Sequence, residues 1–131
     1  MFVHKNVKFN GLEGCNITLE ITKAAEESGV KEGICSVTVL SESTGIVSIP
    51  EKRREILQDI LDDLERILPP RTNYRDNCDP VLAAGRTKAA LLESSKDFII
   101  HEGRVLTSGN VYLLPFSDNS ESSYTIKCCL K

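Results

Sequence analysis

The first segment of the chain alternates between apolar and polar side chains. An extended backbone would place the two kinds on opposite faces, with Val3, Val7 and Phe9 against His4, Asn6 and Lys8. This period of two predicts a half-buried strand over residues 2–9. The same period recurs at 34–40, and an apolar stretch at 46–49 follows a polar turn. We expect a strand in each of these stretches as well.

The strongest periodicity in the chain is helical. From Ile56 to Leu68 the apolar residues recur every three or four positions, which predicts an amphipathic helix that begins at residue 49 or 50. Ser48 and Glu51 resemble a capping box at its start, and Pro69-Pro70 ends it.

The charges on this helix follow an unfavourable order. The basic run Lys52-Arg53-Arg54 falls in the predicted first turn, where the helix dipole disfavours cations. The pair Asp62–Arg66 at i,i+4 contributes only about 0.2–0.5 kcal/mol. Packing of the apolar stripe must therefore dominate the stability of the helix. The basic run is either an anion-binding or partner-facing patch or, as is more common for such runs, a solvated face.

Two shorter helices are also predicted. Thr18 can cap a helix that ends near residue 28, and Gly29 suits a left-handed stop, although a strand through Ile17, Leu19 and Ile21 is the alternative. Asp79-Pro80 has the pattern of a cap and a first helical residue, which predicts a helix over about 80–93. We expect this helix to bury Val81, Ala84, Gly85, Leu92 and the stem of Lys88.

The last third of the chain consists of short apolar runs separated by turn residues. These runs predict strands at 98–101, 104–106, 111–116 and 124–130. Because strands and helices are segregated, we expect an α+β fold with two or three helices packed on one face of a largely antiparallel or mixed β-sheet. No repeat, low-complexity tract or linker interrupts residues 1–131, so we expect a single domain.

Composition narrows the possible functions. The chain has 131 residues, 40% hydrophobic and 27% charged, with a net charge of −3, which are ordinary values for a globular protein. This mild acidity argues against a nucleic-acid partner. No apolar run approaches the roughly 20 residues that cross a bilayer, and the first residues lack the layout of a signal peptide. We therefore expect a cytoplasmic protein without a membrane partner.

The cysteines do not form a recognisable site. Their number is odd, none forms a Cys-x-x-Cys pair, and the chain has only two histidines, His4 and His101. A zinc site or a full disulfide framework is therefore not expected, and reduced thiols are the simplest interpretation. On the last strand, Cys128 is expected in the core and Cys129 on the opposite face.

Hydroxyl groups gather in the turn between the second and third predicted strands. Ser41, Ser43 and Thr44 could bind a ligand there, but such residues more often satisfy the backbone groups of the turn. The sequence contains no Gly-x-Ser-x-Gly elbow, phosphate loop or dinucleotide fingerprint.

The order of short motifs resembles the YjbQ family, whose members are also described as secondary thiamine-phosphate synthases. The resemblance spans nearly the whole chain and rests on the segments Asn16-Ile17-Thr18-Leu19-Glu20-Ile21, Ser28-Gly29-Val30, Gly33-Ile34-Cys35-Ser36-Val37, Ser43-Thr44-Gly45-Ile46, Ile49-Pro50-Glu51, Asn73-Tyr74, Lys88-Ala89-Ala90-Leu91-Leu92 and Gly103-Arg104-Val105-Leu106. It implies the family's fold and its usual homotrimer, in which the site lies near the subunit boundary.

The chain departs from the family pattern at the site itself. Where members carry three histidines, the presumed metal ligands, this sequence has Ser41, Asp76 and Arg86. Serine is a poor replacement for imidazole, and a guanidinium cannot coordinate a cation. We therefore do not transfer metal binding or synthase activity, and we expect no cofactor. Arg86 could instead pair internally with Asp76, which we favour, or stay open for an anion.

Three functions remain open from the sequence. The first is a divergent, non-catalytic YjbQ-like protein that binds an anionic small molecule through Ser41, Ser43, Thr44, Asp76 and Arg86. The second is an enzyme with altered, metal-independent chemistry that uses Ser41, Asp76, Arg86 or Arg104. The third is a purely structural or interaction role.

Overall fold

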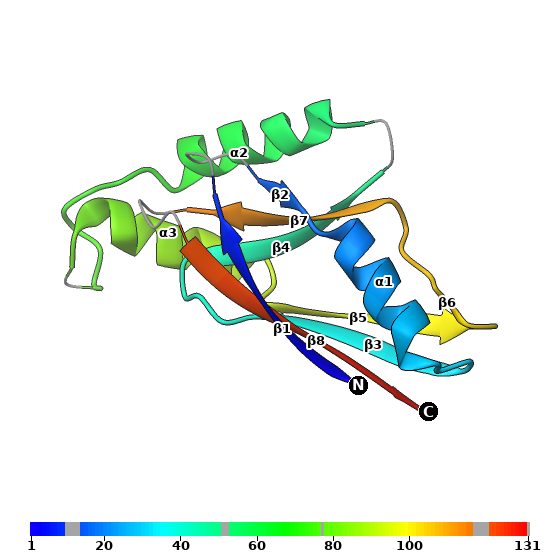
Figure 1. The fold of residues 1–131 in the computed structure, drawn as a ribbon. Helices are drawn as coiled ribbons and strands as arrows, with labels where there is room; N and C mark the ends of the chain where they lie inside the picture. Colours follow the sequence, from blue (N-terminus) through cyan, green and yellow to red (C-terminus); the bar gives the residue numbers. More distant parts are fainter. Residues whose placement is uncertain (10–13, 51–52, 77, 117–120, 131) are drawn as a thin grey trace.

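The computed structural model describes residues 1–9, 14–50, 53–76, 78–116 and 121–130 (Figure 1). Within these ranges the chain forms three helices and eight strands. The helices are α1 (Thr18–Ser28), α2 (Glu55–Ile67) and α3 (Pro80–Leu91). The strands are β1 (Phe2–Lys8), β2 (Cys15–Asn16), β3 (Gly33–Val39), β4 (Thr44–Ile49), β5 (Ser95–His101), β6 (Arg104–Val105), β7 (Asn110–Pro115) and β8 (Glu121–Leu130). No helix among the described residues is long and apolar enough to cross a membrane.

The strands form two antiparallel sheets rather than the one sheet expected from the sequence. The larger sheet has the order β1-β8-β3-β5-β6 and the smaller has the order β2-β7-β4. In Figure 1 the smaller sheet lies between the larger sheet and helix α2, and the short turn from β3 to β4 connects the two sheets. The α+β class is therefore confirmed, whereas the placement of all helices on one sheet is wrong.

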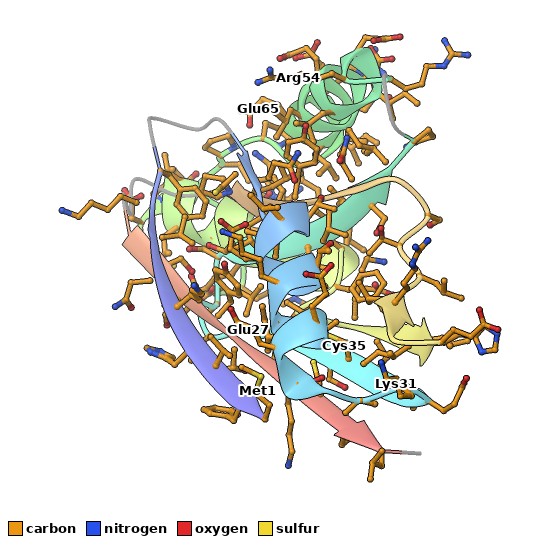
Figure 2. The ribbon with its side chains drawn as sticks, turned by 45° about the vertical axis from the view of Figure 1, so that its right-hand side comes forward. Met1, Glu27, Lys31, Cys35, Arg54 and Glu65 are labelled. Atoms are coloured by element: carbon orange, nitrogen blue, oxygen red, sulfur yellow. The ribbon has the colours of Figure 1, made fainter. Side chains whose placement is uncertain are left out.

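The smaller sheet is buried on both faces, which explains the second layer. Along β7, Val111 and Leu113 join the core beneath α1, while Tyr112 and Leu114 join a second core beneath α2 and α3. A strand covered on both sides reads as a continuous apolar run, so its sequence shows no alternation. Figure 2 shows α1 lying across the inner side of the larger sheet, where it closes the first core.

Helix α1 agrees with the prediction, and the alternative strand stops short of it. Strand β2 ends at Asn16, whose Oδ1 accepts hydrogen bonds from the backbone nitrogen of Thr18 at 3.0 Å and from its hydroxyl at 2.6 Å. Thr18 is thus the first helical residue and not the cap; its Oγ1 accepts instead from the backbone nitrogen of Val111 at 2.8 Å. Gly29 ends the helix with φ 72°, in the left-handed region.

Helix α2 begins at Glu55, later than the predicted start at residue 49 or 50. Strand β4 continues through Ser48 and Ile49, which pair with β7 and cannot start a helix. The predicted capping box therefore fails at Ser48, and its partner Glu51 lies outside the described residues, as does Lys52. Arg53 and Arg54 precede the helix rather than opposing its dipole from within.

The side chains of α2 are less completely covered than their period predicts. Only Leu57 is fully buried, and the next apolar residues of the stripe are half-buried over the second core. Arg66 pairs with Asp63, at 2.5 Å, instead of the predicted Asp62. A further ion pair joins α2 to α3, between Glu65 and the buried ammonium of Lys88.

Helix α3 is capped as the sequence predicts and packs closely on the smaller sheet. The Asp79 carboxylate accepts hydrogen bonds from the backbone nitrogens of Val81 and Leu82, at 3.1 and 3.2 Å. The predicted burial of Val81 is wrong: its side chain is exposed, and Ala83 takes a core position instead. Gly85 lies directly against the Phe116 carbonyl, where an added Cβ would approach the oxygen to 2.3 Å.

Replacing Gly85 with alanine should destabilise the protein, contrary to the usual gain for this change within a helix. The new methyl group must displace the backbone of Phe116, and we expect a loss of about 1–3 kcal/mol in the free energy of unfolding. Chemical denaturation measures the change. Leu91→Ala, at an exposed position on the same helix, is the control and should alter stability by less than about 0.5 kcal/mol. A stabilised G85A variant would mean that α3 is misplaced here.

Candidate functional site

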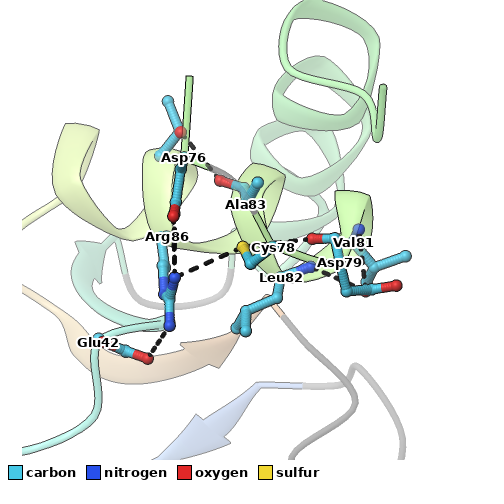
Figure 3. A network of polar contacts seen from close by, with 9 residues as sticks. Glu42, Asp76, Cys78, Asp79, Val81, Leu82, Ala83 and Arg86 are labelled. Atoms are coloured by element: carbon cyan, nitrogen blue, oxygen red, sulfur yellow. Dashed lines mark hydrogen bonds and ion pairs between the residues drawn. The ribbon is translucent and has the colours of Figure 1, made fainter. Parts of the chain in front are cut away.

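The predicted site residues come from three separate segments around the start of α3 (Figure 3). Ser41 and Ser43 lie in the turn between β3 and β4, and Thr44 is the first residue of β4. Asp76 lies in the loop that precedes α3, and Arg86 lies in the middle of that helix. The close packing at Gly85 fixes the height of the neighbouring Arg86 above the smaller sheet.

Arg86 is the centre of the polar network. Its Nη1 donates to both carboxylate oxygens of Asp76, at 3.1 and 3.0 Å, and its Nη2 donates to Glu42 Oε1 at 2.7 Å. Nη1 also contacts the Cys78 sulfur at 3.4 Å. The ion pair expected between Arg86 and Asp76 is therefore present, with a second carboxylate that the sequence analysis did not assign to the site.

The electrostatics of this network are dominated by the two carboxylates. The hydrogen bonds that Arg86 donates to Glu42 and then to Asp76 raise the pKa of Arg86 above its ordinary value, so its positive charge is fixed. Burial is the main cause of the raised pKa of the Cys78 thiol, and the nearby Asp76 adds to it against the opposing effect of Arg86. Cys78 is consequently a protonated thiol at neutral pH and not an activated nucleophile.

The hydroxyl groups of the turn have different roles. Ser41 Oγ accepts a hydrogen bond from the backbone nitrogen of Ser43 at 3.3 Å, which is the turn-stabilising role considered from the sequence. Ser43 is buried, and its carbonyl accepts from the backbone nitrogen of Phe116 at 2.9 Å, which joins the turn to the end of β7. Thr44 is also buried.

An open cavity of about 410 Å³ lies beside the network. Ser41, Glu42, Thr44 and Arg86 line one side of it, and the last turn of α3 with the start of β5 lines the other. A second hollow of about 860 Å³ reaches the same turn from the side of β1 and also includes Ser41 and Glu42. Asp76 and Ser43 line neither of these cavities, so Asp76 reaches the site only through Arg86.

Glu42 is the site residue that sequence reasoning missed. It lies between Ser41 and Ser43, in a turn whose residues were selected as candidate ligands for their hydroxyl groups alone. The available signal was charge: a guanidinium placed in the middle of a largely apolar helix face requires an acidic partner, and one carboxylate need not suffice.

Other candidates are not brought to this site. Arg104 is exposed on β6, which lies across the molecule from α3 in Figure 1. His101 Nδ1 contacts Glu32 Oε2 at 2.9 Å on the surface, and His4 is exposed on β1. Both histidines therefore lie at the surface, and Arg104 is not a partner of Ser41, Asp76 or Arg86.

The described residues do not fit a transition metal at this position. Both oxygens of Asp76 are occupied by Arg86 Nη1, and the guanidinium offers no lone pair while adding a fixed positive charge. Within the described part of the chain, no group of three or more histidine, cysteine, aspartate or glutamate side chains is arranged to hold an ion. Of the three residues that the resemblance sets at the histidine positions, Asp76 and Arg86 form an ion pair with each other, and Ser41 instead accepts a hydrogen bond from the Ser43 backbone.

The fold and the site together define an α+β protein with two antiparallel sheets and a polar cluster beside the turn that joins them. The family model described as UPF0047 protein YjbQ-like matches residues 6–129, and the chain belongs to this family.

Solved structures agree with this assignment. A protein from Sulfolobus solfataricus P2, described as a YbjQ-like protein of unknown function, is 25% identical, with a TM-score of 0.90 over 100% of this chain and 97% of its own. An uncharacterised conserved protein of the YjbQ/UPF0047 family from Clostridium acetobutylicum is 24% identical, with a TM-score of 0.85 over 97% and 99%. A hypothetical protein from Aeropyrum pernix K1 shares the fold at 14% identity, with a TM-score of 0.87 over 100% and 99%. No curated protein matches the chain.

The ion-pair network should contribute to stability cooperatively. In Arg86→Met the carboxylates of Asp76 and Glu42 lose their shared counter-charge, so the melting temperature should fall by a few degrees. Asp76→Asn should lower it less, and the double variant should lose less than the sum of the two single changes.

A surface ion pair provides the matched control for this double-mutant cycle. Arg66→Met and Asp63→Asn disrupt an exposed i,i+3 ion pair of similar composition, and their coupling should be close to zero. Equal coupling in the two cycles would show that the Arg86 network is an ordinary surface pair.

Proposed function

We propose that this chain is a non-catalytic member of the YjbQ-like family whose former metal position has become a closed ion-pair cluster. The observation that carries the proposal is the position of Arg86 between Asp76 and Glu42, with both terminal nitrogens engaged. A side chain held in this way neither coordinates a metal nor offers a general base. The cluster instead ties together the β3–β4 turn, the loop before α3 and α3 itself.

Binding of an anionic small molecule at the same place is the second candidate. It is favoured by the cavity that Arg86 shares with Ser41 and Thr44, and by the buried Arg86 Nε, which has no hydrogen-bond partner among the described residues. The side chain of Glu42 is 67% exposed and can rotate into solvent, whereas Arg86 is only 32% exposed. An anion would replace Glu42 on Nη2. Against it, the two carboxylates already outnumber the single positive charge, so the cluster is net negative.

Metal-independent catalysis has less support. A proton-transfer or nucleophilic mechanism needs an activated group beside a substrate cavity. The polar side chains that line this cavity are hydroxyls, a permanently charged arginine, and Glu42 and Glu93, each in an ion pair. Thiamine-phosphate synthase activity is therefore not part of the proposal, and a cytoplasmic location remains the expectation drawn from the reduced thiols.

Ligand-dependent thermal stability tests the closed cluster against the alternatives. We expect neither zinc nor inorganic phosphate at millimolar concentration to raise the melting temperature, and elemental analysis after dialysis should find no stoichiometric metal. Glu42→Ala removes the acceptor of Nη2, so this variant should gain a phosphate-dependent rise in the melting temperature that Arg86→Met lacks. A rise in the unmodified protein that Arg86→Met abolishes would establish the anion site instead, and about one metal per chain would overturn the proposal.

We further propose the family's homotrimer, with the site near the subunit boundary. Within the described residues, the outer face of the larger sheet is covered by no helix and carries exposed apolar side chains at one end, among them Ile99 at 61% and Leu106 at 53%. A groove that contains Ile99 and Leu106 also contains Glu93 and Ser95, which line the cavity beside Arg86. The apolar surface is thus continuous with the site.

Light scattering on the purified protein should give the mass of three chains at micromolar concentration. Ile99→Asp introduces a charge at the proposed interface and should reduce the mass toward that of one chain while the circular dichroism spectrum is kept. Ile67→Asp, at an equally exposed position on α2, is the control and should remain trimeric. A monomeric parent protein contradicts the proposal.

A further inference from the structure

Two buried cysteines face each other across neighbouring strands of the larger sheet. Cys35 of β3 and Cys128 of β8 are direct partners in the antiparallel register, and both side chains are fully buried. Their sulfur atoms lie 3.4 Å apart, with the Cys128 thiol donating to Cys35. Figure 2 shows Cys35 on β3 beside α1, within the first core.

The backbone around this pair has the geometry that a disulfide needs. Both backbone polar groups of Cys128 point away from β3, because its N–H donates to the Met1 carbonyl at 3.0 Å and its carbonyl accepts from the Met1 nitrogen at 3.2 Å. Cys35 and Cys128 therefore form a non-hydrogen-bonded pair, in which the Cα atoms are about 4.5 Å apart. This separation lies inside the range of about 4.4–6.8 Å that disulfides span.

The other cysteines do not compete for this contact. Cys129 points to the opposite face of β8, is exposed and pairs in register with Ile34. Cys15 and Cys78 are half-buried at distant places, beside β7 and before α3 respectively. Of the five thiols, only Cys35 and Cys128 have a sulfur atom as a hydrogen-bond partner in the described structure.

We propose that Cys35 and Cys128 are an oxidation site that closes to a cross-strand disulfide when the protein meets a peroxide. In the first step one thiolate attacks a peroxide oxygen, the O–O bond breaks, and a sulfenic acid and water form. The second thiolate then attacks the sulfenic sulfur, so that the S–S bond forms, the S–O bond breaks and a second water leaves with the remaining proton. Two thiols are oxidised and one peroxide is reduced.

Burial sets the rate of this reaction. Desolvation, with the hydrogen bond to Cys128, raises the pKa of Cys35 to about 12, so its thiol stays protonated in the closed sheet at neutral pH. Peroxide reaches the pair when the end of β8 opens locally, next to the exposed residues Cys129 and Leu130. Oxidation is therefore slow in the resting protein and faster under mild denaturant or at higher pH.

The closed disulfide would constrain the whole chain. It links residues 93 positions apart and holds β3 and β8, the two central strands of the larger sheet. Cross-linking so long a loop, if the native geometry is kept, should raise the melting temperature by roughly 10 °C.

The test uses the unmodified protein treated with hydrogen peroxide, followed by blocking of free thiols and peptide mass mapping. We expect a Cys35–Cys128 cross-link as the main intramolecular product, a mass loss of two hydrogen atoms, and a raised melting temperature that a reductant reverses. Cys129→Ser removes the exposed thiol and should keep both the cross-link and the rise. Cys35→Ser should lose both.

Two results would overturn the proposal. One is oxidation of Cys128 or Cys35 to sulfinic acid without a cross-link, which would show that the two sulfur atoms do not meet. The other is a Cys129-linked dimer as the sole product under mild denaturant, because opening of β8 would then have failed to expose the buried pair. If Cys35→Ser folds poorly, Cys35→Ala provides the same negative control. Alanine also lacks the thiol, and its small apolar side chain suits a buried position.

Discussion

The structure depends on the burial of β7 from both sides. A strand that is apolar on each face cannot lie at the surface, so it requires one layer above it and another below. The larger sheet with α1 supplies the lower layer, and α2 with α3 supplies the upper one. Because α3 packs on the smaller sheet, mainly against β4, Arg86 is placed where the turn between β3 and β4 and the loop before α3 come together. The position of the polar cluster is thus a result of how the core is arranged.

The polar cluster around Arg86 exists because the fold must supply negative charge to a partly buried guanidinium. A guanidinium on the inner part of α3 is accommodated because Asp76 and Glu42 approach it from opposite sides. A histidine at this position would have been neutral and able to bind a cation, whereas an arginine demands anions. The side chain at this position therefore sets the sign of the partner that the site accepts, and Arg86 selects carboxylates.

Much of this architecture could be read from the sequence, and the failures have physical causes. The alternation in β1 and β3, the Asp79 cap and the stop at Gly29 are local signals, and the structure agrees with them. The second sheet was missed because β7 has no alternation, and α2 begins late because pairing of β4 with β7 extends the strand through Ile49. In the site, Arg86 and Asp76 were found through the family pattern. Glu42 was missed because its role depends on a contact between residues far apart in the chain.

The two carboxylates on Arg86 also bear on how this chain can evolve. Reverting Arg86 alone to histidine would leave Asp76 and Glu42 facing each other without a counter-charge, and it would restore one imidazole of the three that the resemblance implies. Substitutions at these three positions should therefore be epistatic, because the cost of losing the arginine depends on whether its two acidic partners are present.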